Sequence, residues 1–218
     1  MKISDYQYIL CSAFAKVKDI LLDQKILNPG NAKVGFVANA ADLFDSEKNE
    51  NWEIRWVKED EDALKELGYQ LFQIDLKQEN RESLLQKFSE LDVIFVCGGN
   101  TFYLLDCMRK SWFTEIISDY LQKGWIYLST SAGSCVAAPN IEYEKYAADS
   151  ALVKLENYQG LNFCNIAINP HFNEADILED VVPVLNYFLT EKVSFPCVNL
   201  SDQQAVVGNI DGMFKIIS

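Results

Sequence analysis

The chain has 218 residues, of which 49% are hydrophobic and 23% are charged, and its formal net charge is −13. This length suits a single domain spanning residues 1–218 with one core of its own. The negative charge repels phosphate groups over most of the surface and makes nucleic acid a poor partner, and no apolar run approaches the roughly 18 residues of a membrane-spanning helix.

The amino-terminal stretch favours a first strand rather than a secretory signal. Asp5 and Gln7 interrupt the apolar core that a signal peptide needs, so we expect a cytoplasmic protein. The six cysteines are scattered without a CxxC pair, which indicates buried free thiols rather than disulfides or a zinc site. We therefore expect neither a structural metal nor a cofactor.

Short apolar runs alternate with stretches of helical periodicity, which is typical of βα units on a mostly parallel sheet. Strands are predicted at 8–12, 33–39, 70–75, 93–97, 125–129, 164–169, 197–200, 204–208 and 213–217. Helices are predicted at 57–67, 80–90, 101–123 with a break near Ser111, and from about 174 to 190. A hairpin turn at 209–212 makes the last strands antiparallel, and the polar loop 40–52 is long enough to be a mobile flap near a site.

The first candidate site feature along the chain is the pair of glycines that ends the strand at 93–97. Gly98 and Gly99 let backbone N–H groups face a ligand, and Asn100 can begin the next helix. A tight βα turn is the ordinary reason for such a pair. Consecutive parallel strands usually neighbour each other, however, so this turn and the one after Ser129 should lie side by side at the carboxyl edge of the sheet. The N–H groups of Gly99 and Ala132 could then form an oxyanion hole.

The second feature is the corner SerThrSerAlaGly at 129–133, between an apolar strand and small helix-forming residues. A nucleophile elbow needs a sharp turn from strand to helix, with small residues two before and two after the nucleophile. Ser131 occupies the nucleophile position of such a turn. The alternative is that the small residues only let a helix pack closely on a sheet.

The third feature is His171, which follows the predicted strand at 164–169 and is the one histidine of the chain. A lone histidine is more often a surface or structural residue than a catalytic one. Its place after an apolar strand, on the same sheet edge as Ser131, makes it the candidate base, because a serine hydroxyl needs a base to become a nucleophile. The acid that orients the imidazole is left open among Asp202, which a loop position favours, Glu174 and Asp176.

At these residues the chain resembles the serine peptidase family of dipeptidase E (aspartyl dipeptidase) and cyanophycinase. The matching motifs are GlyGlyAsnThrPhe at 98–102, SerAlaGly at 131–133 and AsnProHisPhe at 169–172. The resemblance implies an α/β three-layer sandwich with a mostly parallel sheet, similar to class I glutamine amidotransferases. It also implies the nucleophile Ser131, the base His171, oxyanion donors at Gly99 and Ala132, and a pocket position for Asn100. Asp202 stands where the family has glutamate.

The sequence departs from the aspartyl dipeptidases after the nucleophile. Where they resemble IleArgThrThrAsnAsp, this chain has IleGluTyrGluLysTyr at 141–146, so Glu142 replaces an arginine and Tyr146 an aspartate. If that position contacts substrate, the loss of a cation and the gain of a carboxylate disfavour an acidic side chain.

Three hypotheses follow. The first is a serine-type dipeptidase or exopeptidase acting on short peptides. The second keeps the fold and moves the nucleophile to Cys135 or Cys97, although neither position favours a reactive thiol. The third is a non-catalytic binding or regulatory protein on the same scaffold. A homodimer is open in each case.

Overall fold

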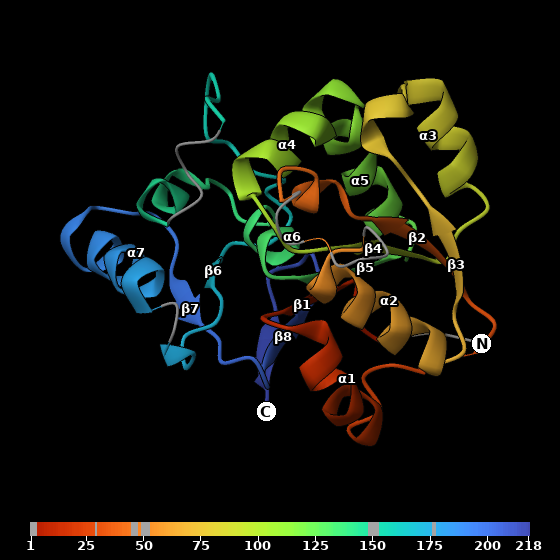
Figure 1. Cartoon of the computed structure of the whole chain (residues 1–218), viewed down its shortest axis with the longest axis horizontal. Coiled ribbons are helices and arrows are strands. Elements are labelled where there is room, and N and C mark those ends of the chain that lie inside the picture. The colour runs from red at the N-terminus through yellow and green to blue at the C-terminus, as the bar shows by residue number, and fades with distance from the viewer. Residues whose placement is uncertain (1–3, 29, 45–47, 49–52, 148–152, 176–177) are drawn as a thin grey trace.

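A seven-stranded sheet forms the centre of the computed structural model, which describes residues 4–28, 30–44, 48, 53–147, 153–175 and 178–218 (Figure 1). The strand order is β3-β2-β4-β5-β1-β8-β9. The parallel strands are β1 (Tyr8–Cys11), β2 (Lys33–Val37), β3 (Gln70–Gln73), β4 (Val93–Val96) and β5 (Ile126–Thr130). β8 (Ala205–Gly208) and β9 (Phe214–Ile217) continue the sheet in antiparallel pairing, as the hairpin turn predicted.

Helices cover both faces of this sheet. α1 (Phe14–Asp23) and α2 (Arg55–Glu66) pack on one face. The other face carries α3 (Arg81–Phe88), α4 (Thr101–Lys110), α5 (Phe113–Gln122) and the short α6 (Ala132–Cys135). Two 3₁₀ turns, η1 (Asn39–Ala41) and η3 (Leu76–Gln78), follow β2 and β3. The arrangement confirms the predicted α/β three-layer sandwich.

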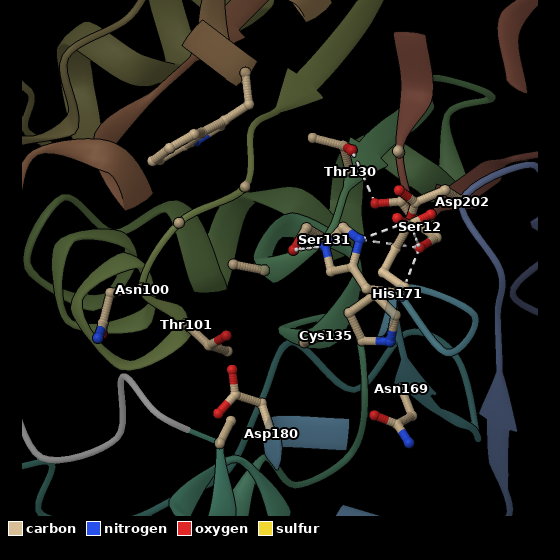
Figure 2. Close-up of a pocket in the computed structure, with 18 of the residues that line it drawn as sticks. Ser12, Asn100, Thr101, Thr130, Ser131, Cys135, Asn169, His171, Asp180 and Asp202 are labelled. Carbon is tan, nitrogen blue, oxygen red and sulfur yellow. Dashed lines mark hydrogen bonds and ion pairs between the residues drawn. The ribbon is translucent and has the colours of Figure 1, made fainter. Parts of the chain in front are cut away.

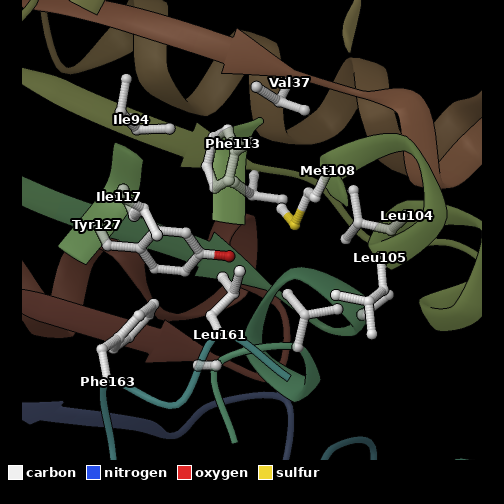
Figure 3. Packing of buried hydrophobic residues seen from close by; sticks show 14 of the residues in the cluster. Val37, Ile94, Leu104, Leu105, Met108, Phe113, Ile117, Tyr127, Leu161 and Phe163 are labelled. Atoms are coloured by element: carbon white, nitrogen blue, oxygen red, sulfur yellow. The ribbon is translucent and has the colours of Figure 1, made fainter. Parts of the chain in front are cut away.

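The core is divided between the two faces because successive residues of a strand point to opposite sides. Ile94 and Val96 of β4 join the cluster beneath α3, α4 and α5, while Val93 and Phe95 join the cluster beneath α1 and α2. Figure 3 shows the first cluster, in which Met108 and Phe113 fill the space between sheet and helices. The strands are buried on both sides, which explains their continuous apolar sequences.

A second, smaller layer lies at one side of the main sheet. β6 (Ala167–Asn169) and β7 (Cys197–Asn199) pair in parallel, and they lie with α7 (Leu178–Thr190) and η4 (Glu142–Tyr146) at the left of Figure 1. This corrects one expectation: the strand before His171 belongs to the two-stranded sheet and not to the edge of the main sheet. The apolar run at 164–169 predicts a buried strand but carries no information about its pairing partner.

Two further differences concern helices. The chain forms α1 directly after β1, a helix that was not predicted although Phe14, Val17 and Leu21 are all buried on one side of it. The predicted break near Ser111 is confirmed, because Trp112 adopts a φ of 67° between α4 and α5. Of the proposed flap at 40–52, Ala40 and Ala41 belong to the buried turn η1, and 45–47 and 49–52 lie outside the described residues. Within the described part of the chain, each helix is too short or too polar to cross a membrane.

Candidate active site

Ser131 occupies a strained corner between β5 and α6. Its backbone has φ 49° and ψ −116°, a conformation that costs a non-glycine residue about 1–3 kcal/mol and persists only where the surroundings enforce it. Enforcement comes from β1, since the Ser131 N–H donates to the carbonyl oxygens of Cys11 at 3.0 Å and Ser12 at 3.2 Å. The turn therefore has the strand, corner and helix of a nucleophile elbow.

The small residues around Ser131 are required by close backbone contacts. A Cβ atom on Gly133 would lie 2.3 Å from the carbonyl oxygen of Val96, so any larger residue would push α6 away from β4. On the other side of the corner, the hydroxyls of Ser129 and Ser134 lie 2.9 Å apart and are fully buried. The small residues thus allow the helix to pack closely and the Ser131 hydroxyl to project from the corner.

His171 reaches Ser131 from the second layer. Its Nε2 lies 2.9 Å from the Ser131 Oγ, and its backbone, like that of Ser131, is left-handed, with φ 59°. The segment is anchored by Asn169, whose side-chain amide donates to Asn199 Oδ1 at 2.9 Å, and by Phe172, whose N–H donates to the Leu200 carbonyl at 3.0 Å. Pairing of β6 with β7 therefore fixes the imidazole above the main sheet edge.

Asp202 is the acid that contacts the imidazole. Its Oδ1 lies 2.6 Å from His171 Nδ1 (Figure 2). Lys16 Nζ lies 2.6 Å from Oδ2. Burial alone would raise the pKa of this carboxyl, but hydrogen bonds from His171, Lys16 and Ser12 outweigh burial and lower the pKa below its ordinary value. An ionised Asp202 can only accept, so Nδ1 carries the proton and Nε2 is free to accept from the Ser131 hydroxyl.

The other two acid candidates do not take this position. Glu174 pairs with Lys16 at 3.7 Å and lines the pocket. Asp176 lies outside the described residues.

The turns after β4 and β5 lie side by side, as strand order predicted, because β4 and β5 are hydrogen-bonded neighbours. Gly99 has a φ of 140°, and a Cβ there would lie 2.2 Å from the Ala40 carbonyl oxygen, so the position is restricted to glycine. Among the described residues, neither the Gly99 N–H nor the Ala132 N–H has a protein acceptor. Both residues line the pocket that contains Ser131.

This pocket has a volume of about 560 Å³, and most of the charged side chains in its described lining are acidic. The two basic residues of its described lining are both paired, Lys16 with Asp202 and Arg55 with Glu59. The acidic residues among its described lining are Glu59, Asp60, Glu144, Glu174, Asp180 and Asp202. Burial raises the pKa of Asp60 to about 8, so this carboxyl is mostly protonated at neutral pH.

The structure corrects one pocket residue and qualifies another. Glu142 is not among the residues that line the pocket, and its carboxylate pairs with Lys145 at 2.7 Å on the surface. The pocket carboxylate of this segment is Glu144, which is 9% exposed and accepts a hydrogen bond from the Thr101 hydroxyl at 3.0 Å. Asn100 does line the pocket, but its Oδ1 accepts from the Tyr103 N–H and caps α4.

The thiols of the alternative hypothesis are buried and neutral. Cys135 borders the pocket but is only 1% exposed, and burial raises its pKa well above the ordinary value. Burial also raises the pKa of Cys97, which is 0% exposed. Neither thiol has the exposed electropositive surroundings that produce a reactive thiolate.

Sequence reasoning missed several residues of the site. Ser12 and Lys16 hold Asp202, and Glu144 lines the pocket with Thr101 and Asp180. Figure 2 labels Ser12, Thr101 and Asp180. Of these residues, only Ser12 could have been found from the sequence, since a polar residue directly after the buried strand β1 lies at the same sheet edge as Ser131. Within the described residues, no group of three or more histidine, cysteine or acidic side chains is arranged to hold a metal ion.

Comparisons with known proteins, by family profile, by sequence and by structure, all find peptidases. Residues 9–216 match the sequence profile of Peptidase family S51. The uncharacterized peptidase PM1590 of Pasteurella multocida is 27% identical over 203 residues, which are 92% of each chain, and a peptidase E of Nostoc is 31% identical over 53% of this chain and 45% of its own. A Listeria monocytogenes structure named for peptidase E has a TM-score of 0.81 at 24% identity, covering 97% of this chain and 98% of the other, a likeness of fold.

Proposed function

This chain belongs to peptidase family S51, and on that premise we propose that it is a serine-type peptidase that hydrolyses short peptides through an acyl-enzyme on Ser131. The comparisons confirm the resemblance to the family of dipeptidase E. The observation that carries the proposal is the continuous contact from Ser131 Oγ to His171 Nε2 at 2.9 Å and from Nδ1 to Asp202 at 2.6 Å.

In the proposed first step the Ser131 Oγ attacks the carbonyl carbon of the scissile peptide bond, and His171 Nε2 takes the hydroxyl proton. The imidazolium that forms is stabilised by Asp202, which is ionised because the hydrogen bonds described above lower its pKa. The N–H groups of Gly99 and Ala132 donate hydrogen bonds to the carbonyl oxygen and stabilise the negative charge that develops on it. In other serine hydrolases the loss of one such donor costs about 10²–10³-fold in rate.

The second half of the reaction returns the proton. The leaving amine takes it from His171 Nε2 as the peptide C–N bond breaks, and the acyl group stays on Ser131. A water molecule then attacks the ester carbon while Nε2 accepts a proton from it, and the collapse of the second tetrahedral intermediate releases the carboxylic acid and restores the Ser131 hydroxyl.

The charge of the pocket favours cationic over acidic substrates. Lys16 and Arg55 are paired with carboxylates, so the pocket has no unpaired cation among its described residues to receive a substrate carboxylate. Glu144 and Asp180 face the same space (Figure 2 shows Asp180 and Thr101). A free amino group or a basic side chain would neutralise them, whereas an acidic side chain would be repelled. Strict cleavage of aspartyl peptides is therefore not the activity we propose.

The size of the cavity favours short substrates. A volume of about 560 Å³ lies within the range of small-ligand pockets. A dipeptide library, with N-acetylated counterparts of each member, tests length, the need for a free amino group and side-chain preference in one screen.

The screen is run with wild type and Ser131→Ala. We expect turnover by wild type, with basic or neutral members preferred, and a loss of about 10⁴-fold or more in Ser131→Ala. Equal turnover by both proteins contradicts the serine mechanism. Absence of wild-type turnover across the library, together with thermal stabilisation by one of its members, would instead support a binding protein on this scaffold.

A further inference from the structure

The candidate nucleophile and the candidate base both have left-handed backbone conformations. Ser131 has φ 49° and His171 has φ 59°. Side-chain contact between them, at 2.9 Å, depends on both backbones staying in these conformations. A group that stabilises both at once would control the geometry of the whole site.

Ser12, at the end of β1, contacts both backbones. Its carbonyl oxygen accepts from the Ser131 N–H at 3.2 Å and from the Thr130 hydroxyl at 3.2 Å. Its side-chain Oγ accepts from the His171 N–H at 2.7 Å. The residue directly after the first strand therefore connects the corner after β5 with the segment after β6, although these lie 40 residues apart in sequence.

The Ser12 hydroxyl has a second bond that fixes its direction. It donates its proton to Asp202 Oδ1 at 2.8 Å, the same oxygen that contacts His171 Nδ1. Ser12 is 0% exposed, so water cannot replace the hydroxyl without a rearrangement. Figure 2 shows Ser12 beside His171 and Asp202. The Ser12 Oγ accepts from the His171 N–H and donates its proton to Asp202. Ser12 therefore fixes the position of His171 relative to Asp202.

We infer that Ser12 is a positioning residue of the catalytic site, which holds His171 and Asp202 in the orientation that lets Nε2 accept the Ser131 proton. This inference rests on the proposed serine mechanism for its kinetic consequence. Ser12 itself does not react: its proton is donated to Asp202 and its oxygen accepts from the His171 backbone.

The test compares Ser12→Ala with Ser12→Thr, which keeps a hydroxyl, and with Ser111→Ala. Ser111 is a matched control, because it is also 0% exposed and its hydroxyl donates to a backbone carbonyl, that of Met108, between α4 and α5. We expect Ser12→Ala to lower kcat about 10- to 100-fold while KM changes less than twofold. Ser12→Thr should recover most of the loss, and Ser111→Ala should lower thermal stability without lowering kcat.

The imidazole provides a readout that is independent of turnover. His171 is the one histidine in the chain, so its ring ¹H and ¹⁵N resonances can be assigned without ambiguity. Ser12→Ala should shift and broaden the Nδ1–H resonance, and Ser111→Ala should leave it in place. If wild type and Ser131→Ala hydrolyse peptide equally, the proposed function fails, yet the resonance still tests whether Ser12 orients the ring.

Two results would overturn the inference. One is a folded Ser12→Ala protein with wild-type kcat and an unchanged Nδ1–H resonance. The other is a loss of kcat in Ser111→Ala as large as that in Ser12→Ala, which would reduce the effect of Ser12 to general destabilisation. If Ser12→Thr does not fold, the comparison of Ser12→Ala with Ser111→Ala still decides between these outcomes.

Discussion

The two sides of the pocket differ in the hydrogen bonds and ion pairs that their acidic side chains make. On the side of β1 and β5, Asp202 receives hydrogen bonds from His171, Ser12 and Lys16, and the strained backbone of Ser131 is held by β1. On the side of η4 and α7, Glu144 is bonded by Thr101, and no hydrogen bond or ion pair to Asp180 occurs within the described residues.

This difference separates the residues that would carry out proton transfer from the residues that would select the substrate. Proton transfer needs atoms fixed to within tenths of an ångström, which only a fully bonded network provides. Substrate selection needs a group that can still form a new bond when the ligand arrives, and Asp180 is such a group within the described part of the chain. We therefore expect substitutions on the first side to change the rate for every substrate, and those on the second side to change the preference among substrates.

The largest expected effect is that of His171→Ala. Without the imidazole, none of the described residues in contact with Ser131 can take its proton, and kcat should fall by about 10⁴-fold or more for every peptide tested. Steady-state kinetics on one cationic and one neutral dipeptide measure the effect. A fall that differs strongly between the two peptides would contradict the separation of the two sides.

Asp202→Asn should lower kcat by about 10³- to 10⁴-fold, because an amide does not hold the imidazole in the tautomer that accepts from Ser131. The same carboxyl has a pH consequence for stability. Its folded pKa lies below the ordinary value of 3.8, so its stabilisation is present above pH 4 or so and is lost as pH falls further. Thermal unfolding at pH 7 and at pH 3 should show a larger difference between wild type and Asp202→Asn at pH 7.

Glu144→Gln and Asp180→Asn should change preference by about tenfold, which corresponds to about 1.4 kcal/mol. The ratio of kcat/KM for a basic over an acidic dipeptide should fall, with turnover of neutral peptides nearly unchanged. Glu142→Gln is the matched control, because it removes the same charge two residues away, outside the pocket. A ratio that falls equally in Glu142→Gln would make the effect one of overall charge.

The smallest expected effect is that of Asp60→Asn on stability. Asp60 keeps its proton up to pH of about 8 in the folded protein because burial raises its pKa from 3.8. The unfolded chain loses that proton near pH 4, so the folded state loses stability relative to the unfolded one as pH rises between these values. The variant should gain Tm over wild type at both pH values, and the gain should be several degrees larger at pH 8 than at pH 4.5. Asp119→Asn, an exposed acid of α5, is the charge control.

Much of the first side was predictable from local sequence. The corner at 129–133 predicts an elbow because small residues flank Ser131 where an apolar strand turns into a helix. The order of parallel strands predicts that the turns after β4 and β5 are neighbours, as they are. The roles of Ser131, His171 and Asp202 remain predictions, but the contact among their side chains that the mechanism needs is present.

The second side of the pocket was harder to predict from the sequence. The pairing of β6 with β7 depends on partners 30 residues apart, and an apolar run does not specify its neighbour. Glu142 was chosen by position along the chain, yet the 3₁₀ turn η4 directs Glu144 inward instead. The bonds of Lys16 and Ser12 to Asp202 span 186 and 190 residues, and no local pattern encodes contacts of that range.

The most direct test of the account is to map the covalent adduct of a serine-directed phosphonate. Intact and peptide-level mass spectrometry, read with residual peptidase activity, should give one adduct per chain on Ser131, complete inactivation, and no adduct in Ser131→Ala or His171→Ala. Persistence of the adduct in Ser131→Ala, or inactivation by an alkylating agent that modifies Cys135 while Ser131 stays unmodified, would contradict the claim that Ser131 is the nucleophile.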